Sequence, residues 1–141
     1  MTAFLDTSVL VAALVEDESH HEACLALLSR RKPAASTHAL AETFSTLTGG
    51  RLGLRVAPDV ATELVESSLL PHLRLVELRA TEIAKVLRQT AAAGVRGGAV
   101  YDFLHLAAAR KAGAQVLYTL NARNFLAFVR AEDPRIQIPG E

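Results

Sequence analysis

The stretch Ala3-Phe4-Leu5-Asp6-Thr7-Ser8 decides the fold, because it joins a short apolar run to an acid and two hydroxyl residues. Such a run is typical of a buried parallel strand that passes directly into the start of a helix. A carboxylate beside apolar residues is costly unless it is paired or bound to a metal. The stretch therefore predicts both a sheet and an acidic site at the end of its first strand.

Two further acids stand in apolar surroundings. Glu42 lies within His38-Ala39-Leu40-Ala41-Glu42-Thr43-Phe44, and Asp102 interrupts Ala99-Val100-Tyr101-Asp102-Phe103-Leu104. Lys and Arg are absent from the immediate neighbourhoods of all three acids. We therefore expect their counter-charge to be a cation that is not part of the chain.

Strand and helix patterns alternate along the rest of the chain. Short apolar runs predict strands near 3–5, 34–36, 76, 115–118 and 136–138. Periodicity, caps and breakers predict helices over 8–15, 19–29, 37–49, 58–69, 81–93 and 100–112, the second opened by a Ser19/Glu22 capping box. This alternation predicts one α/β domain over residues 1–141, with a mainly parallel sheet of about four to five strands and helices on both faces.

The predicted order brings the acids to one edge of that sheet. Sites in open parallel sheets lie beyond the carboxyl ends of the strands. Asp6 is expected at one such end, and Thr119 and Asn121 at another. Asp102 falls in the first turn of a helix and Glu42 about one turn into another, so one cleft can receive all of them.

Oxygen ligands with no Cys or His nearby favour Mg²⁺ or Mn²⁺ over zinc. An ion held by Asp6, Glu42 and Asp102 lowers the pKa of a bound water and neutralises a phosphodiester, which predicts hydrolysis by in-line attack. Ser8 or Thr119 is expected to orient a carboxylate or a water. The five histidines are predicted to be non-catalytic.

Each acid also has an ordinary structural explanation. Asp6 can serve only as the N-cap of the helix that follows it. Asp102 can complement a helix dipole, and Glu42 can be a solvent-exposed helix residue. The metal-site prediction depends on the three occurring together at one end of the sheet.

Composition narrows the class of protein. The 141 residues carry 15 basic and 15 acidic side chains, so binding through bulk positive charge is excluded. The lone Cys24 predicts a buried thiol and no disulfide within the chain. No signal sequence opens the chain, and the early apolar run 9–15 is too short to span a bilayer, which predicts a cytoplasmic protein without a membrane partner.

These segments together resemble the PIN domain, specifically the VapC-type toxins of bacterial toxin–antitoxin pairs. The resemblance rests on 4–10, on the helical Glu42, on Tyr101-Asp102-Phe103-Leu104-His105-Leu106-Ala107-Ala108-Ala109 and on 117–125. It implies a Rossmann-like PIN fold, a Mg²⁺- or Mn²⁺-dependent endoribonuclease, a homodimer, and inhibition by a VapB-like antitoxin. It also implies that Asp6, Glu42 and Asp102 are the core metal ligands.

The chain departs from the family pattern after its last main strand. The family often has an acid there, whereas this chain has Asn121 and Asn124. An amide oxygen can bind a metal but carries no charge, so we expect weaker affinity for a second ion. We assign the fourth ligand position to Asn121, two residues past Thr119, with Asn124 as the alternative and as a supporting residue.

Substrate RNA needs cations around such an acidic pit, and we expect Arg51, Arg96 and Arg123 to supply them. Two rival functions are kept. One is a degenerate PIN module that binds RNA or a protein without cutting, because two asparagines replace acids. The other is a phosphatase-like hydrolase with Asp6 as the covalent nucleophile, although Ser8 stands where such enzymes usually have a second acid.

Overall fold

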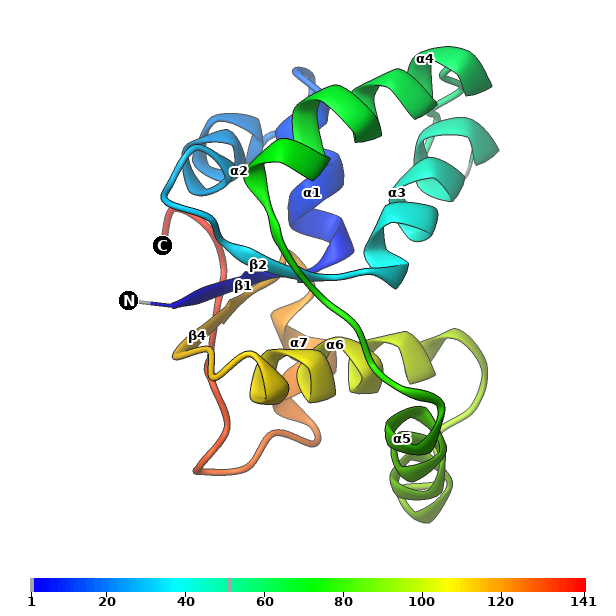
Figure 1. The fold of residues 1–141 in the computed structure, drawn as a ribbon, viewed down its shortest axis with the longest axis vertical. Coiled ribbons are helices and arrows are strands. Elements are labelled where there is room, and N and C mark those ends of the chain that lie inside the picture. Colours follow the sequence, from blue (N-terminus) through cyan, green and yellow to red (C-terminus); the bar gives the residue numbers. More distant parts are fainter. Residues whose placement is uncertain (1, 51) are drawn as a thin grey trace.

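Five short strands form one sheet in residues 2–50 and 52–141, which the computed structural model describes (Figure 1). All neighbouring strands run parallel, in the order β3-β2-β1-β4-β5. The strands are β1 (Ala3–Leu5), β2 (Ala34–Ser36), β3 (Arg74–Val76), β4 (Val116–Tyr118) and β5 (Arg135–Gln137). The predicted α/β fold with a parallel sheet is confirmed.

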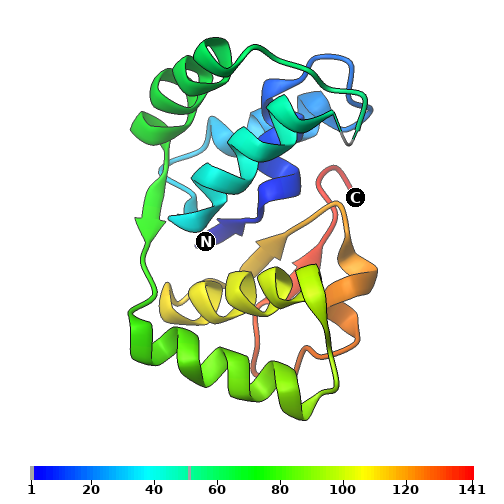
Figure 2. The ribbon, with the colours of Figure 1, turned by 90° about the vertical axis from the view of Figure 1, so that its right-hand side faces the viewer.

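Helices cover both faces of the sheet, as the two perpendicular views show (Figures 1 and 2). One face carries α1 (Thr7–Leu14), α2 (His21–Leu28), α3 (His38–Gly49) and α4 (Pro58–Leu64), which continues through the wider turn η1 (Val65–Leu69) and the tight turn η2 (Leu70–His72). The other carries α5 (Ala80–Ala92), the turn η3 (Gly97–Ala99), α6 (Val100–Lys111) and α7 (Ala122–Leu126). In the part of the chain that is described, no helix has the length and apolarity to cross a membrane.

Alternation along β1 builds a core on each face. Ala3 and Leu5 pack with α1 and α2, whereas Phe4 packs with Leu106 and Phe125 on the opposite face. The strand is fully covered because both of its faces are core, which explains its unbroken apolar run. Cys24 lies in the first of these cores, where burial and the nearby Asp6 and Glu18 raise the pKa of its thiol to about 11.

The sheet order creates a switch point between β1 and β4. The chain moves outward from β1 through β2 to β3, then returns to place β4 on the other side of β1. The residues that follow β1 and β4 therefore face each other, and Asp6 N donates to Tyr118 O at 3.2 Å. Ligands of such sheets bind at this position.

Several element boundaries differ from the sequence prediction, most of them by one or two residues. The proposed Ser19/Glu22 capping box is wrong: α2 begins at His21, and the Ser19 hydroxyl instead contacts His20 Nδ1 at 3.2 Å. The last edge strand begins at Arg135, one residue earlier than expected. The end of α3 is as predicted, because Gly50 adopts the left-handed φ of 80° that glycine tolerates.

An ion pair ties the end of α6 to the turn that precedes β5. Arg110 donates Nε to Asp133 Oδ1 at 2.6 Å and Nη2 to Oδ2 at 2.8 Å, and Arg130 N also donates to Oδ2. The Asp133 side chain is 2% exposed, but that of Arg110 is 35% exposed, so solvent screens part of the attraction. We expect Asp133→Asn to lower the free energy of unfolding by about 1 kcal/mol in urea titrations at pH 7.

The difference in the free energy of unfolding between the wild type and Asp133→Asn should become smaller at acidic pH. The hydrogen bonds from Arg110 hold the pKa of Asp133 below its usual 3.8. A depressed pKa stabilises the fold above the unfolded-state pKa and is lost as the pH falls through the folded-state value. The wild type should therefore approach the variant below about pH 4. Glu132→Gln, at an exposed neighbour, is the control, and equal effects of both changes would contradict a specific pair.

Candidate active site

Asp6 is buried at the junction of β1 and α1, with 3% of its surface exposed. Its Oδ1 accepts from Val9 N at 3.3 Å, so Asp6 is the N-cap of α1. The same oxygen accepts from Ser8 Oγ at 2.6 Å, and Leu120 N donates to that hydroxyl at 2.9 Å. Ser8 therefore links Asp6 to the loop after β4 and fixes the orientation of the carboxylate.

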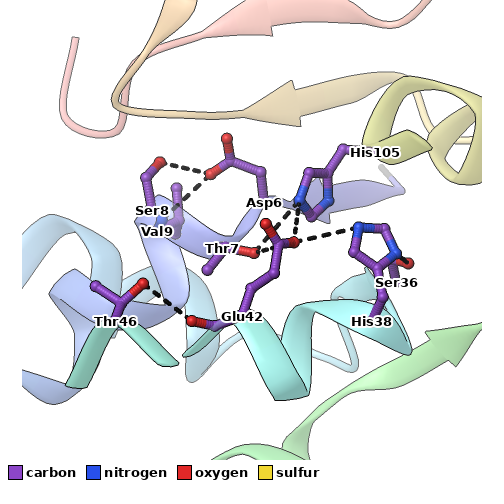
Figure 3. Close-up of polar contacts among 9 residues, drawn as sticks. All are labelled: Asp6, Thr7, Ser8, Val9, Ser36, His38, Glu42, Thr46 and His105. Atoms are coloured by element: carbon purple, nitrogen blue, oxygen red, sulfur yellow. Dashed lines mark hydrogen bonds and ion pairs between the residues drawn. The ribbon is translucent and has the colours of Figure 1, made fainter. Parts of the chain in front are cut away.

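Glu42 lies at the centre of a polar cluster on α3 (Figure 3). Its Oε1 accepts from Thr7 Oγ1 at 3.0 Å and from His105 Nε2 at 3.0 Å. His38 Nε2, one turn earlier on the same helix, lies 3.2 Å from that oxygen. In the figure the second oxygen, Oε2, takes no dashed contact and points to the side of Asp6.

His38, which the sequence already places near Glu42, and His105 both contact that carboxylate. His105 comes from α6 and is 2% exposed, and the rings of His38 and His105 have centroids 4.6 Å apart. Burial acts to raise the pKa of Glu42, but the hydrogen bond with His105 and the close approach of His38 outweigh it and hold the pKa far below the usual value. Glu42 is thus an ionised carboxylate whose partners belong to the chain.

Asp102 has the opposite electrostatic surroundings. It lies in the first turn of α6, where burial and the charges of Asp6 and Glu42 raise the pKa of its carboxyl, while His105 and a hydrogen bond with Asn124 act in the other direction. Acids repel one another at this position without enough positive charge to balance them. A cation placed among them relieves that repulsion.

The four predicted metal-binding residues line one pocket. A cavity of about 340 Å³ is bordered by Asp6, Glu42, Asp102 and Asn121, and also by Thr7, Ser8 and His105. Among the described residues that line it, none is Lys or Arg. The set of carboxylate and amide oxygens, together with the like-charge repulsion at Asp102, fits a hard divalent cation.

Comparison with known proteins agrees with this geometry. Residues 3–131 match the PIN domain family. The chain belongs to the PIN domain family. It is 38% identical over 119 residues to Ribonuclease VapC27 of Mycobacterium tuberculosis, an alignment that covers 84% of each protein. The resemblance predicted from the sequence is confirmed.

Solved structures share the fold of this PIN domain. Mycobacterium tuberculosis VapC20, described as a sarcin–ricin loop cleaving toxin, has a TM-score of 0.69 at 22% identity, over 94% of this chain and all of that one. The DNA-bound VapBC complex of Salmonella typhimurium has a TM-score of 0.67 at 20% identity, over 98% of each chain. At these identities the likeness establishes the architecture.

A second, larger cleft adjoins the acidic pocket of the PIN domain. It measures about 1000 Å³ and shares Glu42 and Asp102 with the smaller pocket. Arg123 and Asn124 from α7 border it, as do the exposed Tyr101 and the half-buried Phe128. The two pockets therefore meet at Glu42 and Asp102.

Some of the remaining predicted site residues border one of the two pockets, and others do not. Asn121 borders the small pocket, whereas Asn124 borders the larger cleft and acts to lower the pKa of Asp102. Thr119 is fully buried and its hydroxyl accepts from Asn121 N at 2.9 Å, so it shapes the loop. Arg96 is exposed before η3 and does not border the cleft. Arg51 lies outside the described residues.

Sequence reasoning placed His38 near Glu42 without predicting a contact between them, and it missed His105 and Thr7 as partners of that carboxylate. The His38 signal was available, since residues four apart on a helix face the same side and the pair His38/Glu42 has that spacing. His105 follows Asp102 by three residues, but its contact with Glu42 joins α6 to α3 and needed the three-dimensional structure.

Proposed function

We propose that this PIN domain is a metal-dependent endoribonuclease and the toxin of a type II toxin–antitoxin pair. The observation that supports this most directly is the pocket that Asp6, Glu42, Asp102 and Asn121 all line, without a Lys or Arg among the described lining residues. The similarity to a ribonuclease at 38% identity supports the same activity. The larger cleft has the size for several nucleotides.

Asp6, Glu42 through Oε2, and Asp102 hold Mg²⁺ or Mn²⁺ in this proposal, with Asn121 as the neutral fourth ligand. A divalent ion, when bound, supplies charge that neutralises the scissile phosphodiester and acidifies a water molecule. Ser8 keeps Asp6 in position, and Thr7 and His105 keep Glu42 in position. Because Asn121 contributes no charge, we expect the pocket to bind a second ion more weakly than the first.

The deciding experiment uses purified, untagged protein and total RNA. We expect cleavage with added Mg²⁺ or Mn²⁺, loss of cleavage with excess EDTA, and recovery when the ion is returned. Binding of RNA without cleavage under all of these conditions would favour the degenerate PIN module that the two asparagines leave open. Covalent phosphate on Asp6 would favour the phosphatase-like rival instead.

Arg123 is proposed to contact a substrate phosphate, because it borders the cleft next to the acids. We expect Arg123→Ala to weaken binding of single-stranded RNA and to reduce the slope of log K against log salt by about 0.7, the loss of one phosphate contact. Adding Arg96→Ala should change the slope less, since Arg96 does not border the cleft. Binding is measured by fluorescence anisotropy without divalent ions.

Arg88→Ala is the matched control for Arg123→Ala, because Arg88 is exposed on α5. Equal slopes for the wild type and Arg123→Ala would remove Arg123 from the binding surface.

The proposed protein partners are inferred from relatives with the same fold. Solved relatives of this fold include a VapBC complex from Rickettsia felis bound to promoter DNA. We propose a VapB-like antitoxin that covers the acidic pocket, a homodimer of the toxin, and a cytoplasmic location, where RNA substrates are found.

A further inference from the structure

Glu42 and two imidazoles form a second donor set within the site. His38 Nε2, Glu42 Oε1 and His105 Nε2 all lie within 4.8 Å of one another. The two nitrogens approach the same carboxylate oxygen, at 3.2 Å and 3.0 Å. Ligand atoms around one small metal ion have spacings of this size, because each stands about 2 Å from the centre.

The chemistry of this set differs from that of the acidic pocket. Two imidazoles and one carboxylate suit Zn²⁺ and other late first-row ions, whereas oxygen-only sets suit Mg²⁺. The set has three protein ligands, so a fourth position is left for water. His38 borders the larger cleft, which gives an ion a path to the site.

His38 is held ready to act as a ligand. Its Nδ1 is hydrogen-bonded to Ser36 Oγ, which fixes the ring, and its Nε2 is buried without a hydrogen-bond partner in the described residues. In the tautomer whose Nδ1–H donates a hydrogen bond to Ser36 Oγ, a lone pair on Nε2 faces the carboxylate oxygen. A cation between them turns that repulsive contact into two favourable ones.

His105 limits the affinity of these three residues for a metal ion. Its Nδ1 is buried without a partner in the described residues, so an imidazole that gives its Nε2 lone pair to a metal leaves a buried N–H unpaired. Metal-binding histidines generally donate that second N–H to a neighbouring group. The site therefore suits an ion that binds and leaves as its concentration changes, rather than a permanent structural ion.

We propose that His38, Glu42 and His105 form a transition-metal site that binds Zn²⁺ and, through the shared Glu42, opposes binding of the catalytic ion. The inhibitory part rests on the proposed nuclease function. Two divalent ions on the two oxygens of one carboxylate repel each other, and the coupling is reciprocal. Zn²⁺ should thus raise the Mg²⁺ concentration needed for half-maximal cleavage.

The binding part is tested without RNA. Zn²⁺ is titrated into untagged protein by calorimetry, and Co²⁺ is used as a probe whose visible absorption reports nitrogen and oxygen ligands in a four-coordinate site. We expect one ion per chain, and an affinity at least about tenfold lower in His38→Asn and in His105→Asn. His72→Asn, at an exposed turn, should bind like the wild type.

His38→Asn keeps the test valid if the buried His105→Asn fails to fold. Unchanged Zn²⁺ affinity in His38→Asn, or no binding by the wild type, would overturn the site. The inhibitory part is tested by measuring the Mg²⁺ concentration for half-maximal RNA cleavage with and without Zn²⁺. Zn²⁺ should raise this concentration more for the wild type than for His38→Asn. Equal increases would overturn the inhibitory part. A protein that binds Zn²⁺ at these residues but never cuts RNA would refute the proposed function alone.

Discussion

Asp6→Asn is expected to lose RNA cleavage by at least about 100-fold while the protein keeps its stability. The activity falls because a ligand charge is removed from the pocket, and a loss of about 3 kcal/mol in transition-state stabilisation corresponds to that factor. The fold is kept because Asn and Asp are nearly equal N-caps, and an amide oxygen can still accept from Val9 N and Ser8 Oγ. Initial cleavage rates and thermal unfolding are measured on the same preparation.

Measuring both the cleavage rate and the thermal unfolding distinguishes a metal ligand from a residue that only caps α1. If Asp6 is only the cap of α1, Asp6→Asn will cut RNA at the wild-type rate. Asp6→Ala should lose activity and also about 1 kcal/mol of stability, since alanine cannot cap. Asp59→Asn, an exposed acid in the first turn of α4, is the matched control and should change neither quantity.

Asp102→Asn is expected to abolish cleavage and to make the metal-free protein more stable. Burial and the charges of Asp6 and Glu42 raise the pKa of Asp102, so its ionised form disfavours the folded state once the pH rises above the ordinary value of 3.8. Removing the charge should stabilise the fold by about 1 kcal/mol, or about 3–4 °C in Tm. Added Mg²⁺ should stabilise the wild type and leave the variant unchanged.

A decrease in Tm for Asp102→Asn would point to the other explanation of this residue. A carboxylate that only complements the dipole of α6 stabilises the helix by about 0.3–1 kcal/mol, and its removal costs that amount. Because the two explanations predict Tm changes of opposite sign for Asp102→Asn, thermal unfolding in EDTA distinguishes them. Asp17→Asn, at an exposed position between α1 and α2, controls for the general effect of losing one negative charge.

Most of the architecture could be predicted from local patterns. The apolar run before Asp6 and the glycines at positions 50, 94 and 113 marked ends that the structure keeps, with left-handed φ at all three glycines. The parallel order of strands follows from their alternation with helices. The assignment of all 141 residues to one domain stays a prediction, since the family match covers residues 3–131.

The site was less predictable, because its contacts cross between elements. The convergence of Asp6 and Asn121 on one pocket follows from the strand ends. The contact of His105 with Glu42 does not, because 63 positions separate them and the rotation of α6 relative to α3 decides it. The absence of Lys and Arg near the acids was taken to mean that no residue of the chain pairs with them. Histidine, which pairs with Glu42, was not considered as such a partner.

The placement of β4 beside β1 means that the pocket is completed only after most of the chain has been synthesised. Its pocket needs Asp6 from the beginning of the chain and Asn121 from near the other end. At about 5–20 residues per second, the ribosome takes roughly 4–16 s to go from Glu42 to Asn121. During that interval the nascent chain lacks Asn121, and any fragment that ends before β4 lacks it permanently, so neither can form the complete pocket.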